Sequence, residues 1–534
     1  MKLDMSVFKK TDFVISAVIA LLLLAWNLKN SFEFGRLAFV PSYDDISYFN
    51  DALLRYQKFL TGNVFTLLRD AYSNPPHSPV IAFQAVISYI VFGVEDWAPY
   101  VFLVWIPFLV ILLAVSYTLN IDRGRWILVL YVATTPLLGA SVVEFRPDIG
   151  NGIFTTLAIV FAINAITESK NIFLTRTMLA SAFFLGGALL FKPSAAVYTV
   201  ALFGFAEVAS LIALLLMRHN QLVFSLYKAG SILTIGLLVS LPYYLAAGHR
   251  VIEYTYNAVV RDKKIWAVDM SMVDQALFYL VGQGGKFMLG LHFWASIASV
   301  VLFFIFRKKF TSSLKLRLYI LIATTFVGYV VVAANSVKTH FLGVTFQALL
   351  VFISFIIFSE LLRIYIGKRA YWPAVSALFL VGITSIQPAG YWGVRDGLYA
   401  QEVRGTIEQV NEAIRGIAST NDKPKVTFMT FTGFLNRDVV TYDLQRRSIA
   451  NMRVDAWFWR PSEEKPEEVF GRAISGSDVV IAATEGTRVA QAGLPSNTIL
   501  PLTLSLVQQN PDFVLLKSIP SGQGSIHIYV RKSI

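Results

Sequence analysis

Long apolar runs are the feature of this sequence that most constrains its fold. A helix needs about 20 mostly apolar residues to cross the hydrocarbon core of a bilayer. Such runs recur through the first 390 residues, so we expect a polytopic α-helical membrane protein with about 11–13 transmembrane helices. The predicted spans lie near 13–29, 97–117, 126–141, 150–167, 177–191, 194–216, 227–246, 287–306, 318–334, 342–362 and 371–388.

The composition agrees with a membrane protein and excludes several other classes. Apolar residues make up 55% of the chain and charged residues 15%, against roughly 45–50% and about 25% in soluble proteins. This apolar content excludes intrinsic disorder, and the absence of cysteine excludes a disulfide scaffold and thiolate metal sites. The net charge of +12 is explained by Lys and Arg that flank membrane spans, so we expect no nucleic-acid partner.

A shorter apolar helix near 79–93 decides the predicted orientation. It follows a proline-rich step and is expected to lie at the membrane interface rather than to cross. With the N-terminus in the cytoplasm, the inner segments then hold 17 Lys and Arg in 64 residues, against 11 in 104 for the outer segments. This bias follows the positive-inside rule, so the first outer loop, 30–78, is predicted to be extracytoplasmic.

The composition changes near residue 389 and predicts a second domain. Residues 1–390 form the predicted membrane domain, and 391–534 contain no further apolar run of 20 residues. A helical pattern near 398–418 is followed by β-rich runs at 425–431, 478–483, 513–517 and 525–531. We therefore expect a soluble extracytoplasmic α/β domain.

The first outer loop carries two adjacent carboxylates, Asp44 and Asp45, soon after the first span. Two acids held together near membrane level raise the pKa of at least one of them, which prepares a general base or a cation ligand. The alternative is structural, because Ser42 or Asp44 could cap a helix over 45–60. A divalent cation on the two aspartates and a histidine is a further alternative, but the sequence requires no cofactor.

Four more outer segments place charges at the ends of predicted spans. Ionisable groups are costly there, so each is a candidate functional residue. The alternatives are that Arg146 neutralises its acidic neighbours, that Lys192 before Pro193 snorkels to the interface, and that the exposed basic residues are simply solvated. These candidates are Glu144, Arg146, Asp148, Lys192, Arg250, Lys338 and His340.

Carboxylates that face cations at one membrane surface suit a reaction between a lipid phosphate and a hydroxyl. A nucleotide-sugar donor is disfavoured, because the glycine-rich stretch 282–286 lacks the strand-to-helix setting of a phosphate-binding loop. No internal repeat supports a transporter built from inverted halves.

In the order of these motifs the chain resembles the polytopic GT-C glycosyltransferases. The branch that it resembles holds the aminoarabinose transferases of lipid A and the protein O-mannosyltransferases. The resemblance covers roughly residues 10–390. It is carried by the Asp44-Asp45 pair, the proline-rich step 74–79 with its following helix, Asp148 after Arg146-Pro147, and Lys192-Pro193.

The resemblance implies a polyprenyl-phosphate sugar donor, an acceptor hydroxyl on a lipid, glycan or protein, and an active site outside the bacterial inner membrane. Asp44 would be the catalytic base with Asp45 beside it, and Asp148 would orient the acceptor or the sugar. Two positions depart from the family pattern: Asn74 and His77 stand where some members carry a lysine, and Asp45 stands in place of Glu. The implied substrate-binding residues are Glu144, Arg146, Lys192, Arg250, Lys338, His340 and His77, with Lys338, Arg146 and Lys192 on the leaving phosphate.

Two rival functions remain open at this stage. An O-antigen ligase or polymerase would use diphosphate-linked glycans and arginine-rich outer loops, and the early acid pair disfavours it. A lipid-linked sugar transporter or flippase would need ionisable residues at the bilayer midplane. The sequence names neither the sugar, the prenyl chain nor the acceptor.

Overall fold

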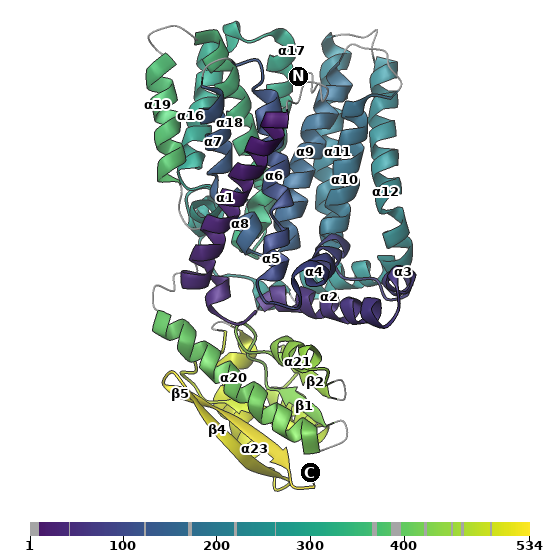
Figure 1. The fold of residues 1–534 in the computed structure, drawn as a ribbon, viewed down its shortest axis with the longest axis vertical. Helices are drawn as coiled ribbons and strands as arrows, with labels where there is room; N and C mark the ends of the chain where they lie inside the picture. The colour runs from purple at the N-terminus through teal and green to yellow at the C-terminus, as the bar shows by residue number, and fades with distance from the viewer. Residues whose placement is uncertain are drawn as a thin grey trace.

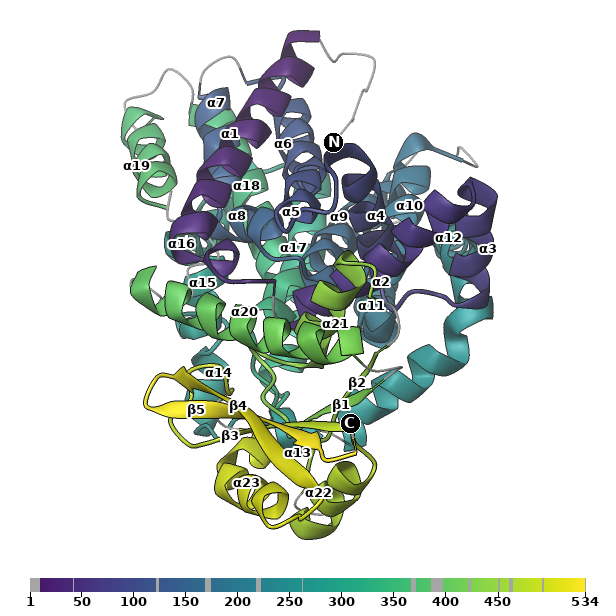
Figure 2. The ribbon, with the colours of Figure 1, turned by 60° about the horizontal axis from the view of Figure 1, so that its bottom comes forward.

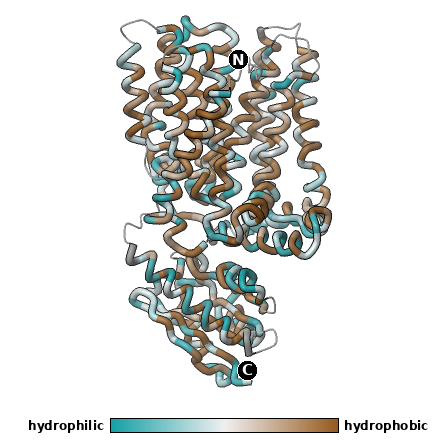
Figure 3. The backbone as a smooth tube through the Cα atoms, viewed as in Figure 1, coloured by the Kyte–Doolittle hydropathy of each residue, from teal (hydrophilic) through white to brown (hydrophobic). Residues whose placement is uncertain are grey.

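A bundle of long apolar helices forms the upper part of the molecule in Figure 1, and a smaller α/β domain lies against its lower end. Figure 3 shows that hydrophobic residues dominate the bundle, whereas hydrophilic residues gather in its end loops and in the lower domain. The computed structural model describes residues 10–41, 43–121, 124–168, 174–217, 222–261, 263–365, 371–385, 397–420, 424–449, 452–460, 464–491 and 494–533.

A helix occupies the described part of every predicted span. Among the described residues, eight helical segments are long and apolar enough to cross a membrane, or nine if the bent pair α7 and α8 counts as one span. The predicted polytopic helical fold is therefore confirmed. The elements at the predicted spans are α1 (Lys10–Phe34), α5 (Ala98–Phe102) with α6 (Trp105–Tyr117), α7 (Arg125–Ala133), α8 (Pro136–Val143), α9 (Pro147–Thr167), α10 (Arg176–Phe191), α11 (Ala196–Met217), α12 (Leu222–Tyr256), α16 (Leu291–Phe306), α17 (Ser312–Ala333), α18 (Val344–Tyr365) and α19 (Tyr371–Thr384).

Helix α9 is the centre of the bundle, and all 21 of its residues are buried. Pro147 stands in its first turn, where its missing N–H costs no hydrogen bond. Gly152 allows close approach to α18, because a Cβ there would lie 2.9 Å from the backbone nitrogen of Thr345. The helix thus holds Asp148, in its first turn, at the lower end of a rigid core.

Shorter helices cover the lower end of the bundle. The helix predicted near 79–93 is α4, and it lies beside α2 at the end of the bundle instead of running along its length (Figure 1). Its interfacial position stays a prediction. The helices outside the spans are α2 (Tyr43–Thr61), α3 (Val64–Ser73), α4 (Pro79–Phe92), α13 (Lys263–Trp266), α14 (Met272–Leu277) and α15 (Gln283–Met288), with short turns η2 (Arg36–Ala38), η3 (Pro193–Ala195), η5 (Asn257–Arg261), η6 (Arg307–Lys309) and η7 (His340–Gly343).

The lower domain is a five-stranded mixed sheet with the strand order β2-β1-β3-β5-β4. Strand β1 pairs in parallel with β2 and β3, and β5 pairs antiparallel with β3 and β4. The predicted domain boundary near 390 lies outside the described residues, and α20 begins at Gly397. The elements are α20 (Gly397–Thr420), β1 (Lys425–Phe428), α21 (Arg437–Arg446), β2 (Arg453–Ala456), α22 (Pro466–Ser475), β3 (Val479–Ala483), η8 (Pro495–Ile499), α23 (Leu500–Gln508), β4 (Phe513–Ser521) and β5 (Gly524–Arg531).

Helices α20 and α21 lie between this sheet and the bundle (Figure 2). The Asn50 side chain on α2 donates a hydrogen bond to the carbonyl of Asp438 at 2.8 Å. Arg404 on α20 donates to the carbonyl of Phe39 at 2.9 Å. The α/β domain is therefore docked on the bundle end where α2 begins.

Candidate active site

The two adjacent aspartates of the first outer loop have different surroundings. The Asp45 side chain is fully buried, with Arg36 at 2.9 Å from one carboxylate oxygen. Its other oxygen accepts hydrogen bonds from the Tyr100 hydroxyl at 2.8 Å and from the backbone N–H of Phe145 at 3.2 Å. Asp45 therefore joins α2 to η2, α5 and the segment before α9, and it does not reach the solvent.

Asp44 lies in the first turn of α2, and its side chain is 65% exposed. Arg146 forms an ion pair with it and also lies 3.8 Å from Asp45. The positive charge of Arg146 lowers the pKa of Asp44. The Arg146 side chain, in turn, is buried and packs 4.4 Å from the ring centroid of Phe341. Asp44 is thus an ionised carboxylate that faces open space. Ser42, the other candidate cap, lies outside the described residues.

Glu144 forms a second buried charge pair beside the first. His340 lies 2.8 Å from one oxygen of this carboxylate and 2.9 Å from the other, and Arg36 lies at 3.8 Å. Burial raises the pKa of Glu144, but the charges of His340 and Arg36 outweigh burial and bring the value to about 2. The ionised Glu144 therefore ties the segment between α8 and α9 to η7.

Asp148 and Lys192 form an ion pair on the other side of Phe341. Asp148 stands in the first turn of α9, where the helix dipole favours a negative charge. Lys192 stands where Pro193 interrupts the chain between α10 and α11. Its side chain is 21% exposed and remains within reach of an adjacent cavity.

The sequence predicted that Lys338 binds the leaving phosphate together with Arg146 and Lys192. In the structure Lys338 contacts the end of a helix instead. Its ammonium donates to the carbonyls of Ala333 at 2.8 Å and Val332 at 3.2 Å, at the end of α17. It also lies 5.2 Å from the ring centroid of Tyr279. Burial lowers the pKa of Lys338. These contacts cap a helix, although Lys338 also lines the cavity that contains Asp44.

His77 and Arg250 lie at the edge of the cluster. The His77 ring packs edge-on against Tyr254 with centroids 4.3 Å apart, and stacks at 6.2 Å from Tyr48 on α2. Arg250, on the extended end of α12, donates to the side chain of Asn74 at 3.1 Å. Arg250 therefore fixes the proline-rich step rather than facing Asp44. The predicted span ended near 246, but α12 continues to Tyr256.

Two cavities of similar size meet at this cluster. The first, of about 520 Å³, is lined by Asp44, Arg146 and His340 from the bundle and by Asn436, Arg437 and Asp438 from the α/β domain. The second, of about 510 Å³, is lined by Asp148, Lys192, Asn151, Tyr254, Lys263 and Asn335. Phe341 lines both cavities and stands between them. Asp44 and Asp148 thus face neighbouring spaces at the same end of the bundle.

An apolar groove of about 930 Å³ continues from the second cavity between α11, α12 and α17. Four residues line both spaces, and almost all others in the groove are apolar. Its polar end therefore lies at the Lys192 break, where Pro193 and Ser194 form part of the wall. The shared residues are Ser194, Tyr198, Thr255 and Val331.

Solved structures with the same architecture are known. ArnT from Cupriavidus metallidurans in the apo state matches with a TM-score of 0.57 at 12% identity, over 96% of this chain and 97% of that one. ArnT bound to undecaprenyl phosphate matches with a TM-score of 0.54, at the same identity and coverage. The chain has the GT-C fold. An Archaeoglobus fulgidus oligosaccharyltransferase in complex with zinc and sulfate gives a TM-score of 0.48 at 14% identity, over 88% and 67% of the chains. No family model and no curated protein sequence matches.

Within this GT-C fold, sequence analysis missed several residues of the cluster. Arg36 was overlooked although it is the first arginine after span one, and it holds both Asp45 and Glu144. Tyr100 and Phe341 carry no sequence signal, since aromatic residues at span ends are common. The α/β domain's contribution to the first cavity was also unforeseen, because it arises from docking of distant segments.

The residues that the structure describes contain no group of three or more His, Asp and Glu side chains that could hold a metal ion. Asp44 and Asp45 do not converge on one point, because Asp45 is turned into the bundle toward Arg36 and Tyr100. A divalent ion on this pair would need further ligands from a substrate or from water.

Proposed function

We propose that the protein transfers a sugar from a polyprenyl-phosphate donor to an acceptor hydroxyl at the extracytoplasmic face of a bacterial inner membrane. The observation that carries this proposal is the continuity between the apolar groove and the cavity at Asp148 and Lys192. Such a space fits a ligand with a long apolar chain and a charged head. ArnT, which shares the fold, has been solved with undecaprenyl phosphate bound, and this supports the same class of lipid here.

Lys192 is the residue that we assign to the donor phosphate. It stands where the groove becomes polar, and an ammonium group binds phosphate as a compact positive charge. As the bond between the sugar and the phosphate breaks, the electron pair leaves with the phosphate oxygen. A cation fixed beside that oxygen stabilises the charge that develops there. Asp148 then orients Lys192 and is positioned to contact the sugar.

Asp44 is the proposed base. Its exposed carboxylate takes the proton of the acceptor hydroxyl while the acceptor oxygen attacks the sugar carbon opposite the phosphate, which inverts that carbon. An ionised carboxylate with a lowered pKa is a weak base, and Arg146 causes that lowering. The charge of Lys192 also lowers the pKa of Asp44. A donor phosphate bound at Lys192 would offset that charge and so raise the basicity of Asp44 before the proton moves.

The first cavity is the proposed acceptor site. Asn436, Arg437 and Asp438 bring polar groups from the α/β domain to face Asp44 and Arg146 across it. An acceptor that carries hydroxyl groups finds both donors and acceptors of hydrogen bonds there. The α/β domain is thus assigned to acceptor binding.

The test is a transfer assay in membranes with a panel of radiolabelled polyprenyl-phosphate sugars. We expect the wild type to consume at least one donor and Asp44→Asn to lose roughly 10²–10⁴-fold in rate, the usual contribution of a general base. Glu33→Gln, an exposed acid near the end of α1, is the matched control and should keep full activity. Retained transfer by Asp44→Asn would remove Asp44 as the base, and inactivity of the wild type toward every donor would count against the donor class.

A further inference from the structure

A separate polar cavity of about 400 Å³ lies at the opposite end of the bundle, among α6, α9, α17 and α18. Helix α9 carries Asp148 in its first turn and Asn164 in its last, and Asn164 lines this cavity. At a rise of 1.5 Å per residue the two positions are roughly 24 Å apart. The cavity is therefore close to a bilayer thickness away from the proposed active site and takes no part in its chemistry.

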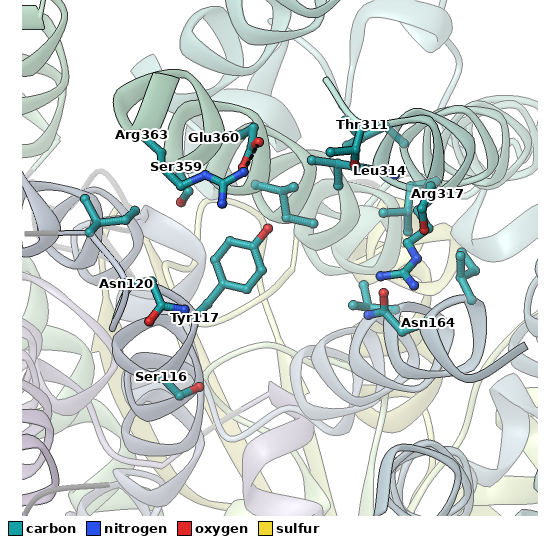
Figure 4. A pocket seen from close by; sticks show the side chains of 17 residues that line it. Ser116, Tyr117, Asn120, Asn164, Thr311, Leu314, Arg317, Ser359, Glu360 and Arg363 are labelled. Carbon is teal, nitrogen blue, oxygen red and sulfur yellow. Dashed lines mark hydrogen bonds and ion pairs between the residues drawn. The ribbon is translucent and has the colours of Figure 1, made fainter. Parts of the chain in front are cut away.

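Two arginines from different helices line this cavity (Figure 4). Arg317, on α17, donates through Nε to the Thr167 hydroxyl at 2.9 Å, and its two terminal nitrogens have no hydrogen bond to other described residues. In Figure 4 its guanidinium points inward, beside Asn164. Arg363, on α18, is 56% exposed and lies on the opposite side of the cavity.

Glu360 is the only carboxylate among the described residues that line this cavity. It accepts a hydrogen bond from Arg363 at 2.5 Å, and its side chain is 11% exposed. Among the described lining residues the two guanidinium groups therefore outnumber the carboxylates, and Glu168, outside the lining, is a further acid whose charge acts on Arg317. The first turn of α17 also faces the cavity, with Thr311 as its cap, and the positive end of that helix dipole adds to the attraction for an anion.

We propose that this cavity binds a phosphate group, carried either by an anionic phospholipid or by a soluble phosphate compound. Arg317 is half-buried and Arg363 is largely exposed, so an anion that enters the cavity can reach donors of both guanidinium groups. The fork of N–H groups on arginine matches phosphate oxygens, and Tyr117, Asn120 and Ser359 line the same space with further polar groups. The inference concerns a second site and does not rest on the proposed sugar transfer.

The test is binding to the purified full chain in uncharged detergent, with inorganic phosphate and short-chain phosphatidylglycerol as the two probes. Native mass spectrometry counts bound phosphatidylglycerol, and the unfolding temperature is followed as each probe is titrated. We expect Arg317→Gln to weaken binding by roughly tenfold or more, the worth of one charge-assisted hydrogen bond. Glu360→Gln should tighten binding, because it removes the opposing charge and releases Arg363. Arg307→Gln, an exposed arginine of η6 outside the cavity, should change nothing.

The two probes separate the sources of the phosphate. A response to phosphatidylglycerol alone supports a lipid head group, whereas a response to both probes supports a soluble phosphate compound. If Arg317→Gln does not fold, the half-exposed Arg363→Gln replaces it, and it should also weaken binding. No response to either probe, or equal weakening by Arg307→Gln and Arg317→Gln, would overturn the proposal.

Discussion

Neighbouring residues on a helix point about 100° apart, and this separates the functions of Asp44 and Asp45. Asp45 is directed into the bundle, where Arg36 and Tyr100 hold it, while Asp44 faces a cavity and forms an ion pair with Arg146. The pair is therefore one buried structural acid and one accessible acid. We accordingly assign proton transfer to Asp44 alone and a positioning role to Asp45.

The difference in burial predicts opposite effects on stability. Asp45→Asn leaves the buried Arg36 without its nearest partner and should cost about 3–5 kcal/mol, as broken buried ion pairs do. Asp44→Asn removes a largely exposed carboxylate and should cost less than about 1 kcal/mol. Denaturant titration of both purified variants in detergent measures this contrast, and equal losses would contradict the assignment.

The pH dependence of transfer should report on Arg146. The charge of Arg146 holds the pKa of Asp44 below its usual range, so wild-type Asp44 stays ionised until the pH falls through that low value. In Arg146→Gln the pKa of Asp44 rises, and the acid limb of the rate profile should move to higher pH. The measurement is the transfer rate of wild type and of Arg146→Gln as a function of pH. Acid limbs that coincide would show that Arg146 does not act on the base.

The charged residues at this end of the bundle can be recognised from the sequence, but the residues with which they form ion pairs cannot. The sequence singled out Asp44, Arg146, Asp148 and Lys192 because ionisable groups at span ends are rare and costly. The structure brings them to one end of the bundle, and their roles stay predictions. Their arrangement as two ion pairs, one on each side of Phe341, could not be predicted, since it depends on how helices distant in sequence pack. Lys338 illustrates the limit, because its capping of α17 depends on loop geometry that hydropathy does not report.

At the scale of the element, hydropathy located the spans but not their interruptions. The span predicted at 126–141 is two helices bent by 49°, because Pro136 prevents the residue before it from remaining helical. Strand β2 was missed, since its four residues, Arg453–Ala456, include two charged side chains and give no alternating pattern. Long apolar helices can thus be predicted from the sequence, whereas short helices and strands depend on the residues that pack against them.

Glycine positions within the bundle give an element-scale prediction. Gly152→Ala places a methyl group 2.5 Å from Val344 and should cost about 1–3 kcal/mol, the usual effect of overpacking. It should also displace the start of α9 and so reduce donor use through Asp148 and Lys192. Gly204→Ala, where a Cβ on α11 meets nothing within 4 Å, is the control and should be neutral or slightly stabilising. Thermal unfolding and transfer assays of both variants test this, and equal behaviour would refute the packing argument.

At the scale of the whole molecule, the two charged cavities and the polar end of the groove lie at one end of the bundle. Figure 1 shows the α/β domain at that same end. In the proposed function the lipid chain lies against α11, α12 and α17, and the acceptor approaches from the side of α21. The orientation expected from the positive-inside bias, with this end outside the membrane, stays a prediction. We therefore propose that the apolar chain of the lipid occupies the groove and that its phosphate is bound at Lys192, where Pro193 interrupts the helix.

Photocrosslinking with a polyprenyl phosphate that carries a photoreactive prenyl chain tests this claim most directly. After irradiation of the purified chain, we expect labelled peptides from the groove walls on α11, α12 and α17. Lys192→Gln should reduce this labelling and unlabelled polyprenyl phosphate should compete for it, whereas Glu33→Gln should leave it unchanged. Labelling spread over the lipid-facing surface of the bundle, and equal in wild type and Lys192→Gln, would contradict the account.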